Sequence, residues 1–125
     1  MEATFCEFPG FHDEIPDHFG GDEEFRLFQI ALMANPTMRD VIPGAGGIRK
    51  VRWPGRGHGK RGGLRIIYLH VPEFQRLLLI DVYFKGEQDD LTVVQRARLA
   101  DYAERYVDYL RGRRRLMEPG KGIEK

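Results

Sequence analysis

Two closely spaced apolar runs constrain the fold of this chain most strongly. Leu64 to Val71 (LRIIYLHV) and Arg76 to Lys85 (RLLLIDVYFK) are rich in the β-branched and aromatic residues that favour strands. The continuous apolar middle of the second run indicates burial on both faces of a sheet. Because the turn between them is short, we expect an antiparallel hairpin. The run IRKVRW (48–53) can pair as a third strand, and residues 2–8 are expected to form an edge strand.

Helix signals flank these strands. Residues 22–35 carry apolar side chains at helical spacing, with Asp22 as the expected N-cap and Pro36 just after the end. Thr92 and Gln95 form a capping box that predicts the start of the last helix. With 125 residues, the chain suits a single domain.

The last helix is expected to end near Gly112, because glycine is a common C-terminal stop. The segment after it carries little apolar content. We therefore predict one domain over residues 1–111 and a flexible tail over 112–125.

Residues 44–65 form a basic, glycine-rich stretch with seven Lys or Arg and eight Gly residues. Its formal charge is +7, against −6 for the rest of the chain. Cations attract phosphates, and glycines let backbone N–H groups approach them closely. The stretch therefore indicates contact with nucleic acid or phosphate, with a solvated basic loop as the alternative.

Several classes of protein are disfavoured by what the sequence lacks. The single cysteine, Cys6, excludes an intrachain disulfide and fits a reducing compartment. The four histidines are scattered without the spacing of a zinc site, so we expect neither a metal nor a cofactor. No run approaches the ~20 apolar residues of a membrane span. A cytoplasmic protein without a membrane partner is the expectation.

Strand alternation predicts which of these charges share a face. Side chains two apart on a strand point the same way. Lys50 and Arg52 therefore share a face on the first basic strand, as do Arg65 and Ile67 on the next. A sheet that unites these cations with the side chains of the last strand would form a cationic floor; the residues expected there are Lys50, Arg52, Arg65, Tyr83 and Lys85. The alternative is ordinary solvent-facing charge on a half-buried sheet.

The blocks GGIRKVRW, GKRGGLRIIY and VYFKGEQDDLT resemble the HigB branch of the RelE-like toxin superfamily. The segment DEEFRLFQIALMANP resembles the one that precedes these blocks there. This resemblance implies an α+β fold, with a small, mainly antiparallel twisted sheet and helices packed on one side. It also implies a toxin of a type II toxin–antitoxin module. Such a toxin is a ribosome-dependent, metal-independent mRNA endonuclease (an mRNA interferase) that inhibits translation, and a helix-turn-helix antitoxin inhibits it.

The resemblance also implies site residues. Lys50 and Arg52 match a basic pair, Arg65 opens the next strand after paired glycines, and Tyr83 and Lys85 match a tyrosine-x-lysine block. Some relatives carry an arginine directly after that lysine and a tyrosine a few residues further on, where this chain has Gly86 and Thr92.

These matches lead to a catalytic hypothesis. Arg65 would grip the scissile phosphate, because a cation stabilises the charge that develops there. Proton transfer would be divided among Lys60, Tyr83 and Lys85. The residues expected to hold RNA are Arg49, Lys50, Arg52, Arg56, His58 and Arg61.

Two other functions remain open. The same basic patch could belong to a non-catalytic module that binds RNA or the ribosome. It could also be a groove for an acidic helical partner protein.

Overall fold

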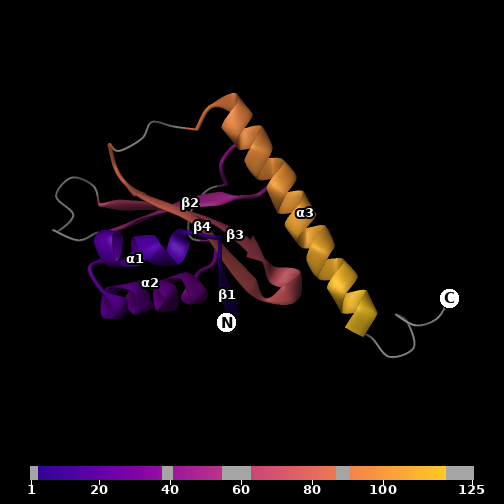
Figure 1. The fold of residues 1–125 in the computed structure, drawn as a ribbon, viewed down its shortest axis with the longest axis horizontal. Coiled ribbons are helices and arrows are strands. Elements are labelled where there is room, and N and C mark those ends of the chain that lie inside the picture. Colours follow the sequence, from indigo (N-terminus) through magenta and orange to yellow (C-terminus); the bar gives the residue numbers. More distant parts are fainter. Residues whose placement is uncertain (1–2, 38–40, 55–62, 87–90, 118–125) are drawn as a thin grey trace.

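The computed structural model describes residues 3–37, 41–54, 63–86 and 91–117. It contains four strands, three α-helices and one short 3-10 helix (Figure 1). In chain order these are β1 (Thr4–Glu7), α1 (Phe11–Phe19), α2 (Asp22–Ala34), β2 (Arg49–Trp53), β3 (Leu64–Val71), η1 (Pro72–Phe74), β4 (Arg76–Phe84) and α3 (Val93–Met117).

The strands form one mixed sheet in the order β1-β4-β3-β2. β3 pairs antiparallel with both β2 and β4, and β1 pairs parallel with β4 at the edge. The predicted hairpin, third strand and N-terminal edge strand are thereby confirmed, and the α+β class with a mainly antiparallel sheet is confirmed with them. Between Ile67 and Tyr68 the β3–β4 register shifts by one residue. Such an irregularity locally increases the twist of a sheet.

One face of the sheet packs against α1 and α2. Its core is aromatic: Phe28 is fully buried and contacts the Trp53 ring edge-on, with ring centroids 5.3 Å apart. Phe19 and Phe25 stand at 5.4 and 6.4 Å from Phe28. The predicted helix over 22–35 is α2; its N-cap is Gly21, however, so Asp22 is the first helical residue.

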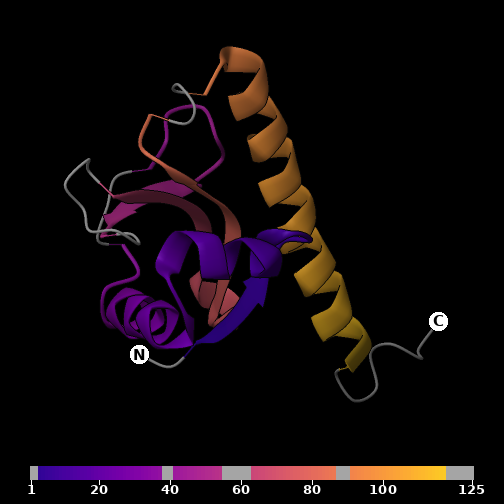
Figure 2. The ribbon, with the colours of Figure 1, turned by 60° about the vertical axis from the view of Figure 1, so that its left-hand side comes forward.

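The opposite face packs against α3, so helices cover both sides of the sheet (Figures 1 and 2). Buried Ile67, Leu69 and Leu78 of the sheet share a core cluster with Ala103 and Leu110 of α3. The helices were expected on one side of the sheet, but α1 and α2 lie on one face and α3 lies on the other. The α3 layer covers the face on which the candidate site lies.

α3 begins where the capping box predicts. The Gln95 N–H donates to Thr92 Oγ1 at 3.0 Å, and the Thr92 N–H donates to Gln95 Oε1 at 2.9 Å. The predicted end near Gly112 is wrong, because the helix continues to Met117. Gly112 does not adopt the positive φ of a C-terminal stop. A glycine inside a helix costs about 1 kcal/mol, which flanking contacts can offset.

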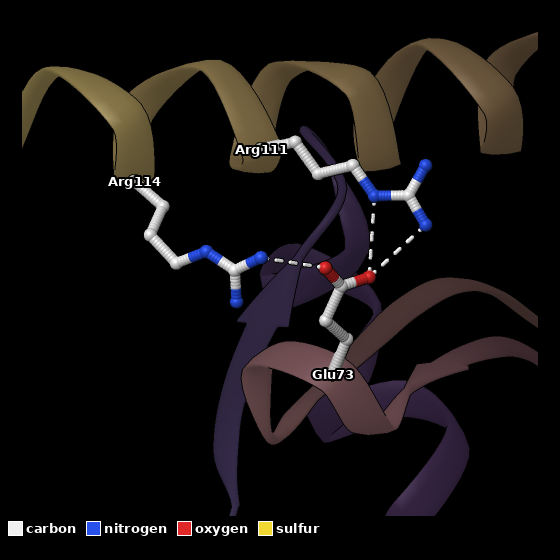
Figure 3. A network of polar contacts seen from close by, with 3 residues as sticks. All are labelled: Glu73, Arg111 and Arg114. Atoms are coloured by element: carbon white, nitrogen blue, oxygen red, sulfur yellow. Dashed lines mark hydrogen bonds and ion pairs between the residues drawn. The ribbon is translucent and has the colours of Figure 1, made fainter. Parts of the chain in front are cut away.

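Those contacts come from Glu73 in η1 (Figure 3). Arg111 Nη2 lies 3.0 Å from Glu73 Oε1, and Arg114 Nη2 lies 2.8 Å from Glu73 Oε2. The Arg114 guanidinium also stands 4.7 Å from the centre of the Phe74 ring. One carboxylate thus fastens residues on both sides of Gly112 to the sheet. The remainder of the predicted tail, 118–125, lies outside the described residues.

Candidate RNA-binding and catalytic face

Three predicted site residues form one row across the sheet. Arg52 on β2 lies opposite Arg65 on β3, and Arg65 lies opposite Tyr83 on β4. Residues directly opposite in antiparallel strands point to the same face, with Cβ atoms about 4.5–5.5 Å apart. Because Tyr83 belongs to the core cluster under α3, this is the α3 side of the sheet. We call these three residues the cationic row.

Two lysines extend the cationic row. Lys50 lies opposite Ile67, two residues along β3 from Arg65, so it shares the face. Lys85 lies two residues after Tyr83, and its N–H donates to the Gly63 carbonyl at 3.0 Å, continuing the β3–β4 pairing. Lys85 and Arg52 are exposed, whereas Lys50 is half-buried. The predicted sharing of one face by all five residues is confirmed; their roles stay predictions.

Arg65 is the most constrained member of the cationic row. It is 8% exposed, and its Nη1 donates to the Leu64 carbonyl at 3.3 Å. Arginine remains protonated in proteins, so a full positive charge stands in a largely desolvated position. A second cation, Arg52, lies directly opposite, and like charges in that arrangement are destabilising. Arg52 and Arg65 therefore concentrate two positive charges at this row of the sheet.

Arg49 does not join the cationic row. It lies opposite Tyr68, whose ring is buried in the core under α1 and α2, so it belongs to the other face. There it stands near His70; burial lowers the pKa of His70, and the Arg49 charge lowers it further. Arg49 is thus placed away from Lys50 and Arg52, although it is their neighbour in sequence.

Four of the predicted site residues fall between β2 and β3. Arg56, His58, Lys60 and Arg61 lie outside the described residues. The described residues on either side of these four are Pro54, directly after β2, and Gly63, directly before β3.

Two positions at which the sequence departs from the pattern it resembles have structural uses here. Gly86 has a φ of +97°, a left-handed conformation that an arginine adopts only with strain. Thr92 is the N-cap of α3 through its hydroxyl. A glycine and a threonine at these places therefore fit the turn and helix start that carry the chain from β4 to α3.

A polar cluster that the sequence analysis missed joins the far end of β4 to α3. Arg76 Nη1 donates to Cys6 Sγ at 3.0 Å, and Tyr106 of α3 stands next to both. Burial raises the pKa of Tyr106 to about 12, with Cys6 adding to the rise. The parallel pairing of β1 with β4 places Cys6 opposite Leu78, which lies two residues after Arg76 on β4. Strand pairing over such a separation leaves no local sequence signal.

Two further observations concern the described ranges alone. Within them, no group of three His, Cys, Asp or Glu side chains gathers in a way that could hold a metal ion. No helix in the same ranges is long and apolar enough to cross a membrane.

The fold is similar to that of the Escherichia coli toxin RelE. A chain of the intact E. coli RelBE toxin–antitoxin complex superposes with a TM-score of 0.51 at 15% identity, over 69% of this chain and 99% of that one. A free-state RelE mutant with two arginines replaced by alanine gives 0.50 at 17% identity, over 70% and 86%. Isolated RelE gives 0.51 at 14% identity, over 86% and 98%.

No protein-family model matches the sequence. At these identities the similarity concerns the fold alone. The chain therefore has a RelE-like fold.

Proposed function

We propose that this protein is the toxin of a type II toxin–antitoxin module, in the HigB branch of the RelE-like superfamily. It would cleave mRNA on the ribosome in the cytoplasm and thereby stop translation. The observation that carries the proposal is the cationic row, in which Arg65 stands between Arg52 and Tyr83. The RelE-like fold and the matching sequence blocks support it.

The proposed reaction is attack of a ribose 2′-oxygen on the adjacent phosphorus of the same strand. A bond forms between the 2′-oxygen and phosphorus, and the bond from phosphorus to the 5′-oxygen breaks. The 2′-hydroxyl proton passes to a base, and the leaving 5′-oxygen receives a proton. The products are a 2′,3′-cyclic phosphate and a 5′-hydroxyl, and no metal takes part.

Arg65 would stabilise the phosphorane, because its guanidinium is fixed by burial before substrate arrives and needs no reorganisation. Tyr83 lies opposite Arg65 on β4, and its hydroxyl would donate to a phosphate bound there. Lys85, exposed at the next position on the same face, and Lys60 would share proton transfer with Tyr83. Lys50 and Arg52 would hold flanking phosphates, with Arg61, Arg56 and His58 as further contacts.

The proposed partners are the ribosome with its mRNA and a helix-turn-helix antitoxin. A cationic surface of this kind can also be neutralised by an acidic protein segment. The outside of the α1–α2 layer is acidic, because it carries six exposed carboxylates: Asp13, Glu14, Asp17, Asp22, Glu23 and Glu24. A negatively charged partner would therefore favour the α3 side of the sheet.

Growth after induced expression tests the proposal. The wild-type chain should arrest growth, and co-expression of the antitoxin should restore it. Arg65→Ala should grow normally, whereas the matched control Arg49→Ala, on the opposite face, should still arrest growth. Undiminished arrest by Arg65→Ala would exclude the proposed role of that residue.

A second candidate function is a non-catalytic RNA- or ribosome-binding module that uses the same surface. Exposed Arg52 and Lys85 favour it, since both could contact RNA without chemistry. A translating extract separates the two functions, because a module would bind ribosomes without generating new 5′ ends in a reporter mRNA.

A further inference from the structure

Buried polar side chains lie on both faces of the sheet. Within the described ranges, the buried side chains of the polar and charged classes are Arg65, at 8% exposed, and His18, at 7%. Arg65 belongs to the cationic row on the α3 side, whereas His18 lies in the last turn of α1, on the other face. A buried polar group is costly unless it is hydrogen-bonded, so the contacts of His18 indicate its use.

The imidazole of His18 is held in one orientation by its own helix. Its Nδ1 lies 2.9 Å from the carbonyl oxygen of Glu14, one turn earlier in α1. A carbonyl oxygen only accepts hydrogen bonds, so Nδ1 carries the hydrogen and donates it. The Glu14 carboxylate also stands 3.3 Å from the same nitrogen. These contacts fix the plane of the ring relative to α1.

The fixed imidazole stacks on Phe84, the last residue of β4. The two ring centroids lie 4.8 Å apart, and the ring planes are inclined by 25°. Side chains alternate along a strand, so Phe84 points to the α1–α2 face while its neighbours Tyr83 and Lys85 point to the α3 face. His18 therefore packs against the back of the strand end that carries both proposed proton-transfer groups.

Strand pairing supports this end of β4 on one side. Within the described part of the chain, β1 pairs with β4 over Arg76–Leu79, and from Ile80 to Phe84 the partner is β3 alone. The Lys85 N–H still donates to the Gly63 carbonyl at 3.0 Å, and the chain then turns at the next residue. Packing against α1 thus adds a support that a second paired strand would otherwise give.

We propose that His18 is a positioning residue for the cleavage reaction. Its ring holds Phe84 in place, and Phe84 in turn fixes the backbone from which Tyr83 and Lys85 reach the RNA. His18 lies on the opposite face from the cationic row, so it acts through Phe84 and does not touch the RNA. The inference rests on the proposed function, because Tyr83 and Lys85 have their roles only there. A misplacement of about 1 Å in a catalytic group can cost about 10²-fold in rate.

Amide hydrogen exchange of the purified full chain tests the positioning. His18→Ala removes the ring, so the Lys85 amide should exchange about ten-fold faster than in the wild type, through local opening of its bond to Gly63. His18→Phe loses the hydrogen bond to Glu14 but keeps a ring, so its rate should stay within about two-fold of the wild type. If His18→Ala does not fold, His18→Leu replaces it, because leucine fills the volume without a flat ring.

Cleavage and binding by the same variants test the catalytic consequence. In a translating extract, His18→Ala should lower the maximal rate of mRNA cleavage by about ten-fold, and His18→Phe should restore it. Affinity for single-stranded RNA should stay within about two-fold of the wild type, because the cations of the cationic row are left in place. A merely destabilised protein would lose binding and cleavage together, so this split separates a positioning role from a structural one.

Phe19→Leu is the matched control. Phe19 follows His18 in α1, but its ring packs against Phe25 and Phe28 of α2, with centroids 5.1 and 5.4 Å apart. The variant should lower the thermal unfolding temperature, while the Lys85 exchange rate and the cleavage rate stay those of the wild type.

Several results would overturn the inference. They are unchanged Lys85 exchange or full cleavage in a folded His18→Ala, equal defects in His18→Ala and His18→Phe, and the same defects in Phe19→Leu. Failure of the proposed function is a different result. The wild type would then cleave no mRNA, while the exchange rate of the Lys85 amide would still distinguish His18→Ala from His18→Phe.

Discussion

The two faces of the sheet differ in the side chains that they bury. Under α1 and α2, the side chains of Tyr68, Phe28 and Trp53 fill an apolar core, and the Tyr68 hydroxyl donates to the Pro36 carbonyl at 2.7 Å. Under α3, the same strands carry buried Arg65 opposite Arg52. The first face buries mainly apolar side chains, and the second brings cationic side chains to the sheet beside its apolar core. This difference separates the residues that hold the fold from those proposed to act on RNA.

The largest expected effect is on the α1–α2 face. Phe28→Ala removes a ring that is 0% exposed and packed among three aromatic neighbours, so it should lower the free energy of unfolding by about 3–5 kcal/mol. Leu27→Ala, at the adjacent and 45% exposed position of α2, should change it by less than about 0.5 kcal/mol. Urea denaturation of both variants measures the contrast. Similar losses for the two would contradict the described core.

A pair of tyrosines sharpens the comparison between the faces. Tyr83→Phe removes a hydroxyl from the cationic row while keeping the ring, and it should slow mRNA cleavage by about 10²–10⁴-fold. Tyr68→Phe, on the opposite face, should leave cleavage intact and cost about 1 kcal/mol of stability, through loss of its hydrogen bond to Pro36. Cleavage rates in a translating extract and thermal unfolding of both variants provide the measurement. Full activity of Tyr83→Phe would remove its hydroxyl from the mechanism.

Two arginines of β2 make the same comparison for binding. Arg52→Ala should reduce the salt dependence of RNA affinity by about 0.7 in the slope of log K against log salt, because one phosphate contact is lost. Arg49→Ala, three residues earlier on the other face, should leave that slope unchanged. Titration of single-stranded RNA at several salt concentrations distinguishes them. Equal slopes for the two variants would mean that RNA does not follow the cationic row.

The smallest effect concerns the fastening of α3. Hydrogen bonds from Arg111, together with its charge and Arg114, hold the pKa of Glu73 below its usual value of 4.5. A lowered folded-state pKa stabilises the fold above the unfolded-state pKa, and this contribution is lost as pH falls through the folded-state value. The last turns of α3 should therefore exchange amide hydrogens faster as pH falls below about 4.5, after correction for the intrinsic rate.

Glu73→Gln supplies the control for that measurement. It cannot titrate, so the corrected exchange rates over residues 111–117 should not change across the same pH range. A wild-type protein whose corrected rates are also constant there would show that Glu73 does not fasten the helix.

Local sequence rules predicted much of the cationic row. Period-two alternation was sufficient to place Lys50 with Arg52 and Tyr83 with Lys85, because strand geometry admits no other arrangement. The same rule places Arg49 with Val51 and Trp53, so its grouping with the residues expected to hold RNA followed composition instead of parity. Charge alone does not identify the face of a strand.

Other features depend on contacts that local rules do not contain. The contact between the rings of Phe8 and Tyr102 depends on the parallel pairing of β1 with β4, and no local signal specifies that pairing. The continuation of α3 through Gly112 depends on Glu73, about forty residues earlier in the chain. Gly46 shows the same limit, since an added Cβ would lie 2.8 Å from the Ala100 Cα, a close approach of the loop before β2 to α3.

The most direct test of the central claim is to map 5′ ends in a reporter mRNA after adding the purified protein to a translating extract. The wild type and Arg49→Ala should produce the same new ends, each carrying a 5′-hydroxyl. Arg65→Ala should reduce them by at least about 10²-fold, while its circular dichroism spectrum stays that of the folded wild type. Unchanged cleavage by a folded Arg65→Ala, or no cleavage by the wild type, would contradict the account.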